Sequence, residues 1–273
     1  MLKIAAGSLA LLAFAAPNFA AQLDPMPLAA HRAVYDLEMT NSTGSKAPND
    51  ARGRIAFDFT GSACDGYAMN FRQVTQLTPN EGPVRVSDMR TATFEDGEGK
   101  SFRFKVQSSV DSTQEEDSDG RATMSTDGGV SLDIAKPRPR KTDIGQDIVF
   151  PTEHIKRIVA AAKAGRTTLA AKVYDGSENG EKIYETLTVI GKPVEKTADE
   201  PAAQLPELSH MPRWPVAISY FTAGKAGDAP DYVLSFDLYE NGISRALKLD
   251  YGDFVLSGAM SKLELLPAAA CGK

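Results

Sequence analysis

The chain has 273 residues and a formal net charge of −6 at pH 7, from 30 lysines and arginines against 36 aspartates and glutamates. This balance excludes nucleic acid and anionic membrane surfaces as favourable partners, because both carry negative charge. With 42% hydrophobic residues, the chain has enough apolar material for one large core.

The N-terminus has the layout of a secretory signal peptide. Lys3 precedes an apolar run over residues 4–16, and a small-residue segment follows over residues 17–22. The run is shorter than the ~20 residues that a membrane-spanning helix needs. We predict a signal peptide over residues 1–21, a single mature domain over residues 22–273, export to the periplasm and no transmembrane segment in the mature chain. An uncleaved anchor is the alternative, and the cleavage position stays open.

Cys64 and Cys271 are the only cysteines. In the oxidising compartment that receives an exported chain, two cysteines pair more readily than they stay free. A bridge across so long a loop contributes about 5 kcal/mol on the chain-entropy model, before any native strain is subtracted. We therefore predict a disulfide between Cys64 and Cys271. Two free thiols, which need a reducing compartment, are the alternative.

Apolar and polar residues alternate over much of the chain, as in residues 54–59 and 101–106, which is typical of half-buried antiparallel strands. Asp-Gly and Asn-Gly pairs between the strands favour hairpins. We predict a mainly β protein of about 13–14 strands, curled into a broken β-barrel because an open sheet would expose long edges. The other strand candidates are residues 33–40, 67–77, 84–95, 122–126, 130–134, 168–174, 183–190, 216–221, 232–239, 244–249 and 254–265.

One segment follows a helical period instead. From Ile155 onward, apolar residues recur at i, i+3, i+4 and i+7, with Thr152 placed as N-cap and Gly165 after the last turn. We predict an amphipathic helix of about three turns that packs its apolar stripe against the curled sheet. Prolines over residues 192–215 indicate an irregular crossing with a short helix around residues 204–209.

No motif for catalysis or metal binding stands out. The histidines His31, His154 and His210 form no His-x-x-x-His pair, and neither Gly-x-Ser-x-Gly nor Ser-x-x-Lys occurs. Residues 115–120 imitate half a calcium loop, but Thr126 stands where the bidentate glutamate belongs, so we predict a solvated hairpin tip. We expect no enzyme, cofactor or metal. A hydrolase of cell-wall or lipid material with unidentified carboxylates is the alternative.

Two further stretches are distinctive. Residues 136–141 form a basic run interrupted by prolines, which indicates an extended edge segment. Aromatic residues gather around Trp214, Tyr220 and Phe221, and Tyr232, Phe236 and Tyr239 follow. Sheet core is the plain interpretation of this group, and the wall of an apolar ligand pocket is the alternative that we carry forward as a weak prediction.

Several short stretches, in order along nearly the whole mature chain, match those of one known family. They are residues 30–37 (AHRAVYDL), 64–67 (CDGY), 150–154 (FPTEH), 175–177 (DGS), 214–216 (WPV), 219–221 (SYF) and 239–242 (YENG). Together they resemble the cell envelope integrity protein B (EipB) family of periplasmic proteins.

The resemblance implies a β-spiral, a broken barrel of about fourteen strands with a helix at its base. It also implies one disulfide, between the positions of Cys64 and Cys271. The family's shape is similar to periplasmic carriers of lipids or lipoproteins and to sensors of envelope stress, which implies an apolar groove. No catalytic residues are attributed to the family. We therefore expect a non-enzymatic protein that supports cell envelope integrity and binds a lipid-like ligand or an envelope protein partner in the concavity of its sheet.

Overall fold

The computed structural model describes residues 27–44, 47–224 and 229–267. The predicted signal peptide over residues 1–21 and the predicted disulfide partner Cys271 lie outside the described residues. Within the described part, the chain forms one 15-stranded sheet with few helices. The strands are β1 (His31–Ser42), β2 (Asp50–Ser62), β3 (Gly66–Thr78), β4 (Arg85–Glu95), β5 (Ser101–Val110), β6 (Thr113–Met124), β7 (Val130–Lys136), β8 (Arg140–Asp143), β9 (Ile148–Val149), β10 (Thr168–Val173), β11 (Tyr184–Ile190), β12 (Arg213–Thr222), β13 (Tyr232–Tyr239), β14 (Ser244–Asp250) and β15 (Phe254–Leu265).

Strands that follow one another in the chain lie next to one another in the sheet, with one break. The order runs from β8 back to β1, continues directly into β15, and then runs back to β9. β1 pairs antiparallel with both β2 and β15, so the first and last strands meet in the middle of the sheet. The edges are β8 and β9, which are consecutive in the chain. The predicted curled sheet is confirmed and is antiparallel except for one parallel pair, β9 with β10. The strands beyond the predicted set are the two short edge strands.

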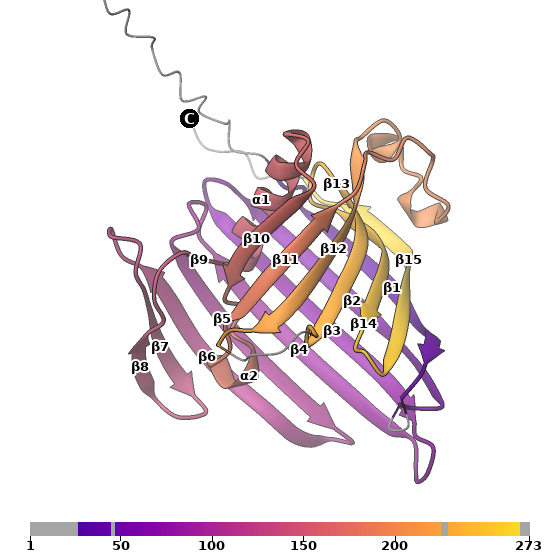
Figure 1. Cartoon of the computed structure of the whole chain (residues 1–273), viewed down its shortest axis with the longest axis horizontal. Helices are drawn as coiled ribbons and strands as arrows, with labels where there is room; N and C mark the ends of the chain where they lie inside the picture. Colours follow the sequence, from indigo (N-terminus) through magenta and orange to yellow (C-terminus); the bar gives the residue numbers. More distant parts are fainter. Residues whose placement is uncertain (1–26, 45–46, 225–228, 268–273) are drawn as a thin grey trace, which may run out of the picture.

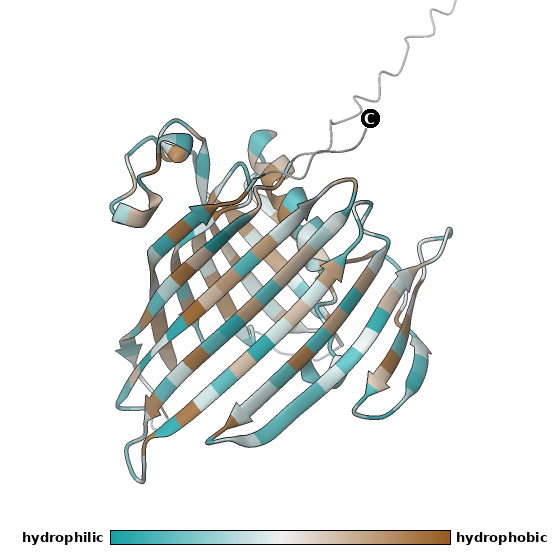
Figure 2. Cartoon of the chain, turned by 180° about the vertical axis from the view of Figure 1, so that it is seen from behind, coloured by the Kyte–Doolittle hydropathy of each residue, from teal (hydrophilic) through white to brown (hydrophobic). Residues whose placement is uncertain are grey.

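The sheet rolls over on itself. In Figure 1 the strands β10 to β15 form a layer in front of the strands β2 to β6. Figure 2 shows the alternation of polar and apolar residues along the strands of the rear layer. Because successive side chains point to opposite faces, each strand turns one set of residues inward and the other toward solvent. Of the basic run over residues 136–141, only Arg140 and Lys141 lie in the edge strand β8, while Lys136 ends β7, so the predicted edge position is confirmed for the end of the run.

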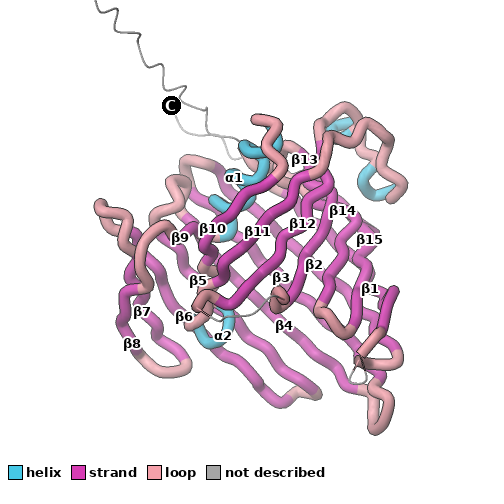
Figure 3. Tube along the Cα trace, viewed as in Figure 1, coloured by secondary structure: helices cyan, strands magenta, loops and turns pink. Residues whose placement is uncertain are grey.

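Helix α1 (Pro151–Lys163) lies at one end of the roll (Figure 3). Its buried residues Ile158 and Val159 pack in one cluster with Trp214 and Ile218 of β12. The helix therefore closes one end of the rolled sheet with its apolar stripe, as predicted. The remaining helical segments are short: α2 (Ser177–Gly180) and the 3₁₀ turns Pro201–Ala203 and Pro206–Leu208, the last of which falls within the predicted residues 204–209.

The N-cap predicted for α1 is wrong. Phe150 is the N-cap residue and makes no side-chain cap, because Pro151 starts the helix before Thr152. The carboxylate of Glu95, from β4, instead accepts the backbone N–H groups of Thr152 at 2.7 Å and Glu153 at 2.9 Å. A distant residue thus satisfies donors that helix starts leave unpaired, and sequence spacing does not reveal it.

Glu95 gives the protein a pH-dependent stability. Its side chain is buried, and this burial raises the pKa of the carboxyl from 4.5 to about 7, against the opposing effect of the two N–H groups and Lys156. Between these two values the unfolded chain loses its proton while the folded chain keeps it, so stability falls as pH rises. Relative to Glu95→Gln, the wild type should lose about 3 kcal/mol of unfolding free energy between pH 4.5 and 7.5. Urea titrations of both proteins at several pH values measure this difference.

Comparison with Glu95→Gln is needed because the buried His154 titrates in the opposite sense. Burial lowers the pKa of its imidazole to about 4, so His154 adds stability as pH rises. Both proteins share this contribution. If the difference in unfolding free energy between the wild type and Glu95→Gln does not change with pH, the pH dependence does not come from Glu95.

The acidic stretch over residues 115–120 is not a hairpin tip, so that prediction is wrong. It lies inside β6, and the turn from β5 falls earlier, at Asp111 and Ser112, both with positive φ. Small residues face inward along β6 because space is short: a Cβ on Gly120 would lie 2.8 Å from Cζ of Phe104. Because the inward residues Ser118, Gly120 and Ala122 are small and the residues around them are mostly acidic, β6 lacks the apolar–polar alternation that identifies the other strands.

A buried ion network attaches the proline-rich crossing to the sheet. The side chain of Arg245 on β14 is only 7% exposed and pairs with Asp199, Glu200 and Asp237. Its Nη1 lies 2.8 Å from Oδ2 of Asp237. Glu200 also accepts the backbone N–H of Met260 at 2.8 Å. The crossing is therefore fixed to the sheet by charged groups that solvent barely reaches, apart from Asp199, whose side chain is 75% exposed.

Candidate functional site

The rolled sheet encloses a cavity of about 470 Å³. Its walls are the inward faces of β1 to β4 on one side and of β12 to β14 on the other, and the start of α1 contributes to one end. The lining residues are Leu28, Ala29, His31, Tyr35, Ile55, Phe57, Phe59, Met69, Phe71, Gln73, Met89, Thr93, Pro151, Thr152, Ile155, Ile218, Tyr220, Tyr232, Leu234, Phe236, Asn241, Gly242, Ser244, Leu247, Leu249 and Tyr251.

The lining is apolar and uncharged. Among the described residues that line the cavity, none is Asp, Glu, Lys or Arg. Sites for small molecules in proteins measure about 300–1,000 Å³ and have this mainly apolar character. An engineered apolar cavity of about 150 Å³ stays dry and takes up benzene. The space here is large enough for a much longer apolar molecule.

Stacked aromatic rings stiffen both walls. On the β1 and β2 side, Phe57 lies 5.4 Å from His31 and 6.3 Å from Phe59 between ring centroids. On the opposite side, Tyr220 and Tyr232 stack at 4.4 Å with an interplanar angle of 13°. Rings in contact lose little further freedom when a ligand arrives, so the cavity is preorganised for an apolar guest.

The titratable groups of the lining are neutral near pH 7. Burial lowers the pKa of His31. Its Nδ1 lies 2.7 Å from the carbonyl oxygen of Ala29, so Nδ1 carries the proton and Nε2 is left as an acceptor. Burial raises the pKa values of Tyr220 and Tyr232 far above neutrality. The lining thus offers hydrogen-bonding groups without any charge.

Tyr251 marks an opening of the cavity. It belongs to the lining, yet 38% of the residue is exposed, and it follows β14 in the turn to β15. Its ring packs against Phe254 at 5.0 Å. A guest held inside can therefore leave a polar end at Tyr251, where water is present.

The structure separates the three aromatic residues that the sequence grouped as a pocket wall. Tyr220 lines the cavity. Trp214 packs with α1 in a filled cluster, and Phe221, next to Tyr220 on β12, points to the opposite face by strand alternation. Tyr232 and Phe236 of β13, which belong to the same aromatic group in the sequence, do line the cavity, whereas Tyr239 packs in another cluster. The sequence does not reveal Phe57 and Phe59 of the opposite wall, because alternation identifies an inward face but not which part of it stays unfilled.

Cys64 lies in the exposed turn between β2 and β3. The backbone N–H groups of Cys64 and Asp65 both donate to Oγ of Ser62, at 3.3 and 3.1 Å. The described part of the chain contains no free cysteine. Because Cys271 lies outside it, the pairing of Cys64 with Cys271 stays a prediction.

The described residues contain no cluster of three or more His, Cys, Asp or Glu side chains placed to hold a metal ion. No helix among them has both the length and the apolar character needed to cross a bilayer.

Comparison with known proteins gives consistent matches over most of the chain. The family model described as EipB-like matches residues 22–267. The cell envelope integrity protein EipB of Brucella abortus (strain 2308) is 36% identical over 239 residues, covering 87% of this chain and 84% of that protein. A crystal structure of a beta-barrel-like protein of a domain of unknown function, also from Brucella abortus, superposes with a TM-score of 0.84 at 35% identity and covers 89% of this chain and 100% of its own.

Proposed function

From the premise that this chain belongs to the EipB-like family of cell envelope integrity proteins, we propose that it acts without catalysis, by holding a lipid-like molecule in the cavity of its rolled sheet. The predicted signal peptide supports a periplasmic location for the protein. The observation that carries the proposal is the cavity of about 470 Å³ without a charged side chain among its described lining residues.

Burial of a hydrocarbon chain supplies the binding energy. Apolar surface removed from water contributes about 25 cal/mol per Å², and the aromatic walls are already in place to receive it. A charged group inside would lose its hydration without gaining a counter-charge. The charged or strongly polar end of the ligand therefore stays at Tyr251, and the apolar chain lies between β2, β3 and β13.

The hydrolase alternative has no support at this cavity, because the described lining residues include no carboxylate. An envelope protein partner is the other candidate occupant of the concavity. The opening at Tyr251 and the enclosed aromatic walls favour a slender chain over a folded partner.

Filling the cavity tests the proposal. The double variant Met89→Trp with Leu249→Trp adds two large rings to opposite walls and should weaken binding of N-phenyl-1-naphthylamine, a neutral apolar fluorescent probe, at least tenfold. Val86→Trp is the matched control, because Val86 lies on the same strand β4 but is 43% exposed. The control should bind within twofold of the wild type.

Native mass spectrometry after gentle extraction from cells gives the second measurement. Wild type and Val86→Trp should carry lipid-sized adducts that the cavity-filled variant lacks, while circular dichroism shows all three folded. A wild type that carries no adduct and does not bind the probe overturns the proposal.

A further inference from the structure

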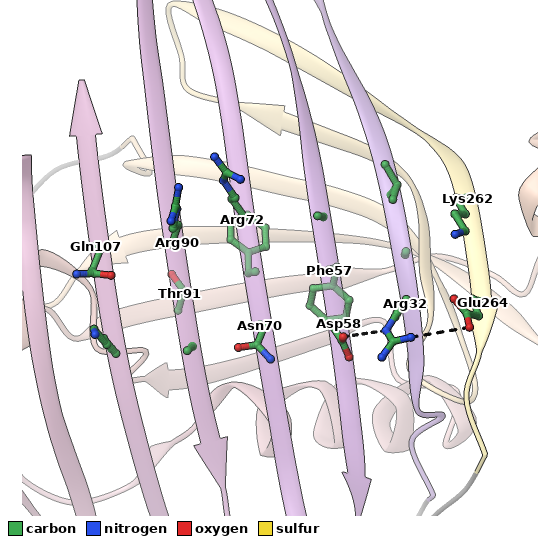
Figure 4. A pocket seen from close by; sticks show the side chains of 16 residues that line it. Arg32, Phe57, Asp58, Asn70, Arg72, Arg90, Thr91, Gln107, Lys262 and Glu264 are labelled. Carbon is green, nitrogen blue, oxygen red and sulfur yellow. Dashed lines mark hydrogen bonds and ion pairs between the residues drawn. The ribbon is translucent and has the colours of Figure 1, made fainter. Parts of the chain in front are cut away.

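A second depression, of about 460 Å³, lies on the outer face of the sheet. It crosses the strands from β15 over β1, β2, β3 and β4 to β5 (Figure 4). Its floor consists of short side chains on neighbouring strands: Val34 faces Ala56, and Asn70 faces Ala92. We call this depression the outer groove. It is separate from the cavity, although Phe57 and Phe71 of the intervening wall border both.

The outer groove is positively charged on a protein whose net charge is −6. Its lining holds five cationic side chains and only two carboxylates, Asp58 and Glu264. The cations are Arg32, Arg72, Arg90, Lys105 and Lys262. Charges of one sign gathered in a depression raise the local concentration of the opposite sign.

The carboxylates in and beside the groove do not neutralise it. The guanidinium of Arg32 forms ion pairs with both carboxylates of the lining, Asp58 at 2.9 Å and Glu264 at 3.9 Å (Figure 4). Lys105 and Lys262, at the two ends, form no ion pair within the described residues, and Lys105 interacts only at longer range with Asp117 of β6. The ends of the groove are therefore its most available positive positions.

Arg72 and Arg90 lie directly opposite each other on β3 and β4. Like charges in that position destabilise a sheet, and here both guanidinium groups share one carboxylate, that of Asp88, at 2.9 and 3.0 Å. These two arginines hold the pKa of Asp88 down at about 2. Because one carboxylate serves two guanidinium groups, the cluster keeps a net positive charge. The side chains of Arg72 and Arg90 are 51% and 57% exposed, so this charge is accessible from solvent.

The dimensions of the groove fit an extended peptide. Six strands about 4.8 Å apart span roughly 24 Å, which an extended chain covers with about seven residues. A membrane surface is too flat to enter a depression floored by alanines, and its anionic headgroups are repelled by the acidic remainder of the protein. A short polypeptide segment can follow the groove and place its carboxylates at the cations.

We propose that the outer groove binds an extended acidic segment of another envelope protein, with carboxylates at the Arg72, Arg90 and Lys105 end and at Lys262. Arg32 is already paired and positions its two carboxylates beside the floor, where they repel peptides with misplaced negative charge. The site is independent of the cavity ligand, because it faces solvent on the opposite side of the strands.

The test uses the mature full-length protein and a fluorescent seven-residue peptide of alternating Glu and Ser. At low ionic strength, fluorescence anisotropy should show saturable binding, with no binding of the Gln-for-Glu peptide. Arg72→Gln with Arg90→Gln should weaken binding at least tenfold. Lys100→Gln with Lys141→Gln removes the same charge from exposed ion pairs elsewhere and should leave binding within twofold.

Two further arms make the result decisive. The cavity-filled variant should bind the peptide like the wild type, so that a failure of the cavity proposal and a failure of this one are distinguishable. Vesicles with anionic phospholipid should not bind through Arg72 and Arg90. The proposal is overturned by equal binding to the groove variant and its control, by no binding to the wild type, or by groove-dependent vesicle binding in place of peptide binding.

Discussion

Replacing Arg245 by leucine is expected to lower the free energy of unfolding by about 3–5 kcal/mol, because it leaves the largely buried carboxylate of Glu200 without its cationic partner. Glu200 is only 12% exposed, so water compensates little for the lost guanidinium, whereas Asp237 keeps its ion pair with Arg213 at 3.2 Å. Glu200 keeps its backbone donors at Ala246 and Met260, but these do not replace a full positive charge.

Urea unfolding followed by circular dichroism measures the effect. Arg54→Leu is the matched control, because Arg54 pairs with Asp36 on the outer face with a side chain that is 67% exposed, and exposed pairs contribute little. Adding Glu200→Gln to Arg245→Leu should recover part of the loss, since the two residues share one network. Equal destabilisation by Arg245→Leu and Arg54→Leu would show that the network is not buried in solution.

Replacing Cys64 by serine is expected to lower the unfolding free energy by as much as about 5 kcal/mol if the predicted bridge to Cys271 exists. The turn that carries Cys64 leaves little room to adjust, because a Cβ on Gly97 would lie 1.7 Å from the carbonyl oxygen of the neighbouring Ala63. A bridge from this fixed turn to the C-terminal segment restricts the unfolded chain more than the folded one.

Thermal unfolding of oxidised and reduced wild type, with Cys64→Ser beside them, checks this prediction. The reduced wild type should melt like Cys64→Ser, and both well below the oxidised wild type. Ala63→Ser controls for a change within the same turn. Identical melting of the oxidised and reduced wild type contradicts the bridge.

Most of the sheet could be predicted from the sequence because its strands obey a local rule. In β2 and β5, side chains alternate between core and solvent, and glycine-containing turns separate neighbouring strands. The failures occur where distant residues decide the structure. β6 has small inward residues because Phe104 occupies the space, and Glu95 caps α1 from another part of the chain.

The candidate site was less predictable than the fold. Tyr220 and Trp214 look alike in sequence, yet α1 covers Trp214 while Tyr220 faces open space. The outer groove could not be found from sequence at all, because Arg72 and Arg90 become neighbours only through the register of β3 and β4. Sequence alternation predicts which residues share one face of a strand, but only the folded structure shows which residues lie opposite that face.

The meeting of β1 and β15 in the middle of the sheet has a consequence for how the protein matures. Their ladder joins His31 to Leu265, residues from opposite ends of the described chain. As the chain is synthesised from its N-terminus, one side of β1 stays unpaired until the last strand has been made. Such distant pairings form slowly, so an incomplete chain would present β1 as an open template for aggregation.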